Sequence, residues 1–269
     1  TAYLHNFTAY LIILLRGEVM NLKNLSVFVL AMVFSLTTAT VQLASAETYM
    51  GVGLGVSIPH EVNDVGASAS GFTISLQDVE PDNSFVYGFK LGHFFSSLPW
   101  IGAEFNFSQS DPDIDKESTF ATITNTPTGA FVGQTSNAFL LSADVANFSS
   151  FGFLAKLRPT KEQIEMYSWG KLEPVLGLGF AVNHIDVDRG IVFSTAGTEI
   201  GRTASGDSDT DIGILVSAGL NYKVSDSISA YGEYKYTEMS FELDGMDEGV
   251  NYSGDIQGSE ILFGLAYSF

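Results

Sequence analysis

The chain has 269 residues, of which 45% are hydrophobic and 16% are charged, so it is expected to fold into a compact domain. Its formal net charge is −19 and it has only 12 Lys and Arg residues, which argues against nucleic-acid binding. Cysteine is absent, which excludes disulfides, a thiolate nucleophile and a Cys-based metal site. Abundant Gly (27) and Phe (21) with only 7 Pro favour an all-β fold.

The first 46 residues predict a targeting segment. A short basic region that starts at Met20 precedes an apolar run from Leu25 to Leu36, and Ala44 and Ala46 then form the small-x-small pattern of a signal-peptidase site. A transmembrane helix is the alternative, but the run is shorter than the ~20 residues that a bilayer core requires. We therefore predict an upstream extension from a misplaced start over residues 1–19, a signal peptide over 20–46 and the mature domain over 47–269.

After Ala46, apolar and small or polar residues alternate with a period of two, which is typical of strands. The last segment is the clearest, because Ile261, Phe263 and Leu265 alternate with Leu262 and Gly264. Segments of this kind predict eight strands in an antiparallel up-and-down transmembrane barrel. The predicted strands span residues 48–58, 84–96, 100–109, 147–158, 171–183, 211–224, 228–237 and 258–269.

The predicted connections alternate between short turns and long loops. The long ones span 59–83, 110–146, 184–210 and 238–257, an arrangement typical of barrels with short periplasmic turns and long extracellular loops. A soluble β-sandwich is the alternative, but four loops of this length would be unusual in it. The stretch from Thr119 to Gln134 is either a hairpin above the membrane or a further strand pair, which would make ten strands.

Aromatic residues mark the edges of the predicted membrane belt. Trp100 and Trp169 fall at predicted periplasmic turns with Tyr167 nearby, where amphipathic rings suit the headgroup region; buried core tryptophans are the alternative. The last strand presents an apolar stripe that resembles the sorting signal of outer-membrane barrels. It consists of Phe263, Leu265, Tyr267 and Phe269.

The segments "ILFGLAYSF", "LEPVLGLGFAV" and "ILVSAGLNYKVSDSISAYGEYKYT" resemble the OmpA-like and opacity-type outer-membrane β-barrel family. The resemblance covers essentially the mature chain and implies location in the outer membrane, surrounded by lipid and lipopolysaccharide, after insertion by the barrel-assembly machinery. It also implies a structural, adhesive or antigen-like role without a cofactor. A small passive pore and a lipid A-modifying enzyme are the alternatives. We expect no peptidoglycan-binding domain after the last strand, unlike in full-length OmpA-type proteins.

The sequence offers little for catalysis or for a tight metal site. The mature chain has three His residues, His60, His93 and His184, which are predicted to lie apart and to be solvated or interfacial. Two Asp-x-Asp-x-Asp segments begin at Asp111 and Asp207, but neither continues with the Gly and Glu of a calcium loop. Solvated loop acids that bind divalent cations loosely are the preferred interpretation.

Charge is concentrated in the four predicted long loops. They contain 21 acidic and 3 basic residues, so they contribute −18 to the net charge. Such a surface repels anionic partners unless Mg²⁺ or Ca²⁺ bridges them, and it attracts cationic ligands at low salt. The sequence does not identify a loop ligand.

The inward rows of the predicted strands carry four bases and four acids. Because an unpaired buried charge is costly, we predict ion pairs that plug the narrow lumen. The predicted pairs are Lys90 with Glu104, Lys156 with Glu173, Lys223 with Glu233, and Lys235 with Glu260.

Overall fold

The structure is a computed structural model that describes residues 47–60, 63–69, 72–77, 81–112, 114–124, 134–167, 169–194, 199–202, 205–247 and 250–269. The predicted upstream extension and signal peptide, including Ala44 and Ala46, lie outside these residues and stay predictions.

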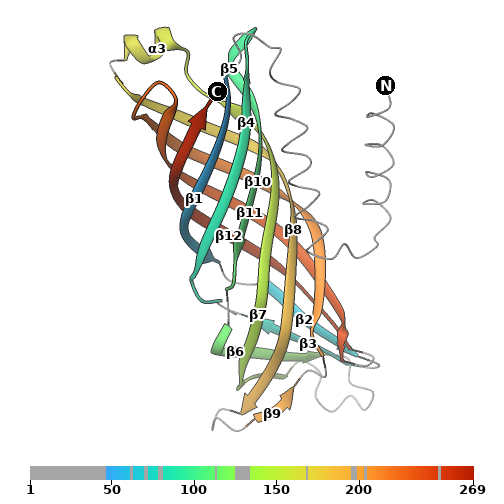
Figure 1. The fold of residues 1–269 in the computed structure, drawn as a ribbon. Coiled ribbons are helices and arrows are strands. Elements are labelled where there is room, and N and C mark those ends of the chain that lie inside the picture. The colour runs from blue at the N-terminus through green and yellow to red at the C-terminus, as the bar shows by residue number, and fades with distance from the viewer. Residues whose placement is uncertain are drawn as a thin grey trace, which may run out of the picture. The chain divides into compact units, whose positions relative to one another are not determined.

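Eight antiparallel strands form a closed barrel, as Figure 1 shows. The last strand of the chain pairs with the first, from Tyr49↔Ser268 to Pro59↔Gly258, which confirms the predicted closure. In ring order the strands are β1 (Glu47–Pro59), β4 (Ser84–Phe95), β5 (Leu98–Ser110), β7 (Gln134–Leu157), β8 (Leu172–Ser194), β10 (Asp207–Lys223), β11 (Ile228–Asp247) and β12 (Val250–Ser268).

Further short strands extend the sheet at one end of the barrel only. β2 (Asn63–Ala69) pairs with β12, β6 (Ile114–Thr124) pairs with β7, and β3 (Phe72–Gln77) lies between β2 and β6. β9 (Glu199–Arg202) pairs with β8. At this end β2, β3 and β6 bridge β12 to β7, in the place that β1, β4 and β5 take nearer the short turns. The described ring therefore contains eight strands, and not ten.

We call the end of the barrel that carries β2, β3, β6 and β9 the far end, and the opposite end the short-turn end. At the short-turn end β4 and β5 are joined by Ser96 and Ser97, and β10 and β11 by residues 224–227. The β7–β8 connection contains the helix α3 (Lys161–Met166), at the same end as the C-terminus in Figure 1. Within the described ranges, no helix is long and apolar enough to cross a membrane.

A capping box starts α3. The Thr160 side chain accepts a hydrogen bond from the Gln163 backbone N–H, and the Gln163 side chain accepts one from the Thr160 N–H. A hydrogen bond from its own backbone N–H, supported by one from the Thr160 hydroxyl, lowers the pKa of the Glu162 carboxyl. The sequence analysis placed a plain connection here and missed this helical turn.

Several strands are longer than the alternation predicted. β7 begins at Gln134 instead of 147, β8 runs to Ser194 instead of 183, and β11 runs to Asp247 instead of 237. Much of the predicted loops at 110–146, 184–210 and 238–257 is therefore strand. Beyond the lipid belt both faces of a strand can be polar, so the period-two signal fades although backbone pairing continues.

The two faces of the barrel wall differ as the stripes predicted. Apolar residues of the outward rows are largely exposed, for example Val52 (63%), Leu178 (65%) and Phe263 (67%). Leu265, Tyr267 and Phe269 continue the exposed row at the end of β12. Exposure of long apolar rows on a closed barrel is what a lipid-facing surface requires.

Candidate functional site

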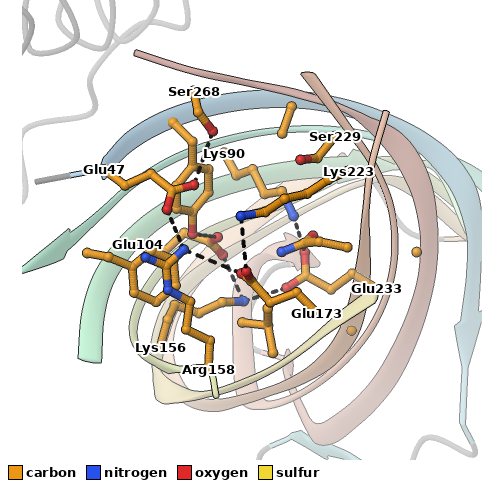
Figure 2. Close-up of a pocket in the computed structure, with 17 residues that line it drawn as sticks. Glu47, Lys90, Glu104, Lys156, Arg158, Glu173, Lys223, Ser229, Glu233 and Ser268 are labelled. Atoms are coloured by element: carbon orange, nitrogen blue, oxygen red, sulfur yellow. Dashed lines mark hydrogen bonds and ion pairs between the residues drawn. The ribbon is translucent and has the colours of Figure 1, made fainter. Parts of the chain in front are cut away.

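Charged side chains on the inward rows of seven strands gather in the lumen near the short-turn end. Figure 2 shows them pointing toward one another. Seven of the eight predicted lumen residues are at most 7% exposed, whereas Lys223 is partly exposed. The seven are Lys90 of β4, Glu104 of β5, Lys156 of β7, Glu173 of β8, Glu233 and Lys235 of β11, and Glu260 of β12.

Lys156 is the centre of the first ionic network. Its Nζ lies 2.6 Å from Glu233 Oε1 and 3.2 Å from Glu104 Oε1, and it donates a hydrogen bond to Ser217 Oγ at 3.0 Å. Glu233 also pairs with Lys90 at 3.2 Å. Each lysine is therefore buried and has a carboxylate partner.

Aromatic rings line the same network. The Tyr49 hydroxyl donates a hydrogen bond to Glu104 Oε2, and Lys90 Nζ lies 3.4 Å from the centre of the Tyr231 ring. The inward glycines make room for these rings: a Cβ at Gly92 would collide with Tyr49, and one at Gly53 would lie 2.5 Å from the Tyr231 hydroxyl. The small residues of the predicted inward stripes thus serve as space for the lumen side chains.

A second network closes the short-turn mouth of the lumen. Arg158 forms ion pairs with Glu47 and, at 3.4 Å, with Glu173, and its guanidinium lies 3.7 Å from the centre of the Phe94 ring. Lys223 lies 3.6 Å from Glu173. The sequence analysis missed Glu47 and Arg158, although each extends an inward row by one step, Glu47 before Tyr49 and Arg158 after Lys156.

Three of the four predicted partner choices were wrong, and the structure replaces them. Lys90 pairs with Glu233, Lys156 with Glu104 and Glu233, and Lys223 with Glu173. The register explains the change for Lys90, because Glu104 lies opposite Gly92 whereas Lys90 lies opposite Asn106. Only the contacts of Glu233 cross the lumen, since β11 pairs with neither β4 nor β7. The other two new pairs join neighbouring strands: Lys156 lies opposite Gly102, two residues from Glu104, and Glu173 lies opposite Asn221, two residues from Lys223.

Lys235 and Glu260 do pair as predicted. They lie directly opposite each other on β11 and β12, with 3.6 Å between Nζ and Oε2. Ser108 Oγ donates a further hydrogen bond to Glu260 Oε1 at 2.8 Å. Direct cross-strand opposition is the one arrangement that simple counting along a hairpin recovers.

The two networks near the short-turn end are electrically balanced and almost fill their space. They contain four carboxylates and four cationic groups, and the cavity left among them has a volume of about 30 Å³. That volume suits one or two water molecules and no organic ligand. The charged groups are Glu47, Glu104, Glu173, Glu233, Lys90, Lys156, Arg158 and Lys223.

An apolar cluster occupies the interior toward the far end. Phe148 of β7, Ile185 of β8 and Met239 of β11 belong to it, and all are at most 8% exposed. The other buried members are Val145, Val187 and Leu243, with Phe241 and Ile256 packed against them. The described interior therefore has two layers of different chemistry, ionic near the short-turn end and apolar toward the far end.

The three histidines lie on different strands or beyond their ends. His60 hydrogen-bonds to Ser259, His93 to Thr48 and His184 to Thr210, at 2.8 to 2.9 Å. No hydrogen bond joins any of them to a carboxylate among the described residues.

The second Asp-x-Asp-x-Asp segment is not a solvated loop, which corrects the sequence interpretation. Asp207, Asp209 and Asp211 lie in β10, and each accepts a hydrogen bond from a backbone N–H of β11. In the first segment Asp113 lies outside the described residues. Over the part of the chain that is described, no group of three His, Asp or Glu residues is arranged to hold a metal ion.

The aromatic residues predicted for the membrane edge lie at the short-turn end. Trp100 is the last residue of the exposed first part of β5, and its backbone carbonyl accepts a hydrogen bond from the Arg158 backbone N–H. Trp169 stacks on Tyr167 after α3, with 5.5 Å between ring centres. Both tryptophans are at least 40% exposed, so they are not core residues.

Comparison with known proteins gives a family match over most of the chain. The model of the family described as "Outer membrane protein beta-barrel domain" matches residues 26–269. No curated protein sequence is similar enough to be counted as a relative.

The chain is also similar to several solved structures, at low sequence identity. Neisserial surface protein A is 13% identical over 83% of this chain and 99% of its own, with a TM-score of 0.46. OprG from Pseudomonas aeruginosa is 13% identical over 84% and 96%, with a TM-score of 0.46. The outer membrane protease OmpT from Escherichia coli is 9% identical over 86% and 100%, with a TM-score of 0.45.

Proposed function

The chain belongs to the outer membrane protein β-barrel domain family, and from this we propose that it is a non-enzymatic barrel that spans the outer membrane with a plugged lumen. Its role is structural or in surface contact, and the short turns face the periplasm. The acidic segments of the far end face the outside, where they meet lipopolysaccharide and, through bridging divalent cations, other anionic groups.

The observation that carries this proposal is the lumen itself. The ionic layer has equal numbers of acids and bases, and these groups bind each other within the barrel. The adjoining space is too small for a solute, and the apolar cluster lies further along the axis. An eight-stranded barrel is just wide enough for side chains to fill, so this interior supports a wall and not a channel.

The outward stripe of β12 supports a role in assembly. Phe263, Leu265 and Tyr267 are exposed on the strand that closes the barrel against β1, with Phe269 beyond it. An extended strand is recognised by backbone pairing, with alternate side chains giving specificity. We infer that this stripe contacts the barrel-assembly machinery during insertion.

Conductance tests the proposed function against a passive pore. In planar bilayers the purified mature domain should show no large, steady conductance comparable to that of a porin, because no continuous water path crosses the two layers. Heat-modified gel migration of the same sample would show that the barrel is folded. Steady porin-like openings of the folded wild type would overturn the plugged-lumen proposal.

The enzyme alternative has its own readout. Mass spectrometry of lipid A from cells with and without the protein should give identical spectra. Loss or gain of an acyl chain that depends on the protein would replace the structural role with a lipid-modifying one.

A further inference from the structure

The contacts between β10 and β11 change along the barrel, from backbone pairing near the short-turn end to side-chain bridges toward the far end. The backbone ladder runs from Lys223↔Ser229 to Leu215↔Thr237 and stops there, although β10 begins at Asp207 and β11 continues to Asp247. The other edge of β10 stays paired with β8 along its length, from Tyr222↔Leu172 to Asp207↔Val187. The two strands therefore separate on the β11 side only.

Aspartate carboxylates bridge the separated strands. Asp211 Oδ2 accepts from the Ser240 backbone N–H at 3.0 Å, Asp209 Oδ2 from Glu242 N–H at 2.7 Å, and Asp207 Oδ2 from Asp244 N–H at 2.9 Å. Steps of two residues on both antiparallel strands make these three bonds a regular ladder. We call this part of the wall, β10 residues 207–211 and β11 residues 240–244, the seam.

A glycine stands where the backbone ladder ends. A Cβ on Gly213 would collide with the backbone carbonyl of Glu238, so a larger residue there would force the strands apart. The strands are thus in close contact at Gly213, and regular carboxylate bridges follow directly beyond it. The backbone pairing therefore gives way to an ordered set of side-chain contacts, and the strands do not simply fray.

The seam is expected to be held together by less free energy than the rest of the wall, for two physical reasons. Three side-chain bonds replace a backbone ladder, and each depends on one rotatable side chain. Its surroundings are acidic on every neighbouring strand, so like charges repel across it. These acids are Asp186 and Asp188 of β8, Glu238, Glu242 and Asp244 of β11, and Asp255 of β12.

The apolar cluster lies behind the seam. Met239 and Leu243 alternate with the N–H donors on β11, and Ile185 and Val187 lie opposite Asp209 and Asp207 on β8. Strands on both flanks thus supply the cluster, and separation of the seam would give water access to it.

We propose that the seam is the segment of the barrel wall that opens first, and that the carboxylates of Asp207, Asp209 and Asp211 hold it closed. At the far end, β10 and β11 can then separate within the wall. The β10–β11 backbone ladder toward the short-turn end and the ionic layer stay intact.

Hydrogen–deuterium exchange of the folded full barrel in detergent tests this proposal. The Asp209→Ala variant should raise the exchange rate of the Glu242 amide about tenfold or more, because a hydrogen bond to a charged acceptor is worth at least that factor. Asp209→Asn keeps an acceptor oxygen and should have a smaller effect. Ser208→Ala, the matched control on the outward face of β10, should have none.

A second readout follows opening directly. The chain has no Cys, so Met239→Cys places one thiol in the apolar cluster. A water-soluble thiol reagent should modify it slowly in the parent and several times faster when Asp209→Ala is added. Heat-modified migration of each variant verifies folding. Equal exchange and equal labelling in the folded Asp209→Ala and Ser208→Ala proteins would overturn the proposal.

Discussion

Replacing Lys156 with Met should be among the most destabilising single changes in the barrel. The substitution leaves Glu104 buried without a cationic partner and reduces Glu233 to its single contact with Lys90. Breaking a buried ion pair by removing one partner costs about 3–5 kcal/mol. We expect a loss of that size in the free energy of unfolding, measured by urea titration of the barrel in lipid vesicles.

Two further variants make this expectation specific. Adding Glu104→Gln to Lys156→Met removes the orphaned charge, so the double variant should recover part of the loss, with a coupling energy of about 0.5–3 kcal/mol. Lys161→Met, in the exposed turn helix, should change stability by less than about 0.5 kcal/mol. Simple additivity of Lys156→Met and Glu104→Gln would show that the two groups do not interact.

A positive charge on the outward apolar row should have the second large effect. Leu178 is 65% exposed and lies within the apolar row of β8, between Leu176 and Phe180. Arg on the lipid face of a barrel costs about 2–4 kcal/mol near the bilayer midplane and close to nothing at its edges. We therefore expect Leu178→Arg to destabilise the barrel by about 2–4 kcal/mol in vesicles.

Ser208→Arg is the matched control for this prediction. Ser208 is also exposed and outward, but it lies at the far end of β10, beyond the apolar residues Ile212 and Ile214. The same substitution there should cost about 0–1 kcal/mol. If Leu178→Arg and Ser208→Arg destabilised the barrel by similar amounts, the lipid belt would lie elsewhere on the wall.

The barrel could be predicted from sequence because period-two patterns report on burial directly. Val52, Leu178 and Phe263 lie on the face that their alternation indicated, and β12 closes against β1 as expected. The charged residues of the lumen could likewise be predicted from the sequence, since side chains on the inward rows must point into the interior. What failed was the choice of partners, because diagonal contacts between neighbouring strands and contacts across the lumen both depend on the stagger of the closed barrel.

The structure at the far end could not be predicted for a different reason. Asp207, Asp209 and Asp211 are acids in a polar stretch, and that composition normally indicates a solvated loop. Their role appears only once β11 lies beside them and offers its backbone N–H groups. The apolar cluster was missed because most of its members, such as Val187 and Met239, lie beyond the ends of the predicted strands.

Reactivity of the lumen lysines tests the plugged barrel most directly. In the folded barrel, Lys90, Lys156 and Lys235 are at most 7% exposed, whereas Lys161 and Lys171 are exposed at the short-turn end. A small water-soluble amine reagent, followed by peptide mass spectrometry, should modify the two turn lysines and spare the three lumen lysines until the protein is boiled. Modification of Lys90, Lys156 and Lys235 in the folded barrel at the rate of Lys161 would show a water-filled lumen and contradict the account.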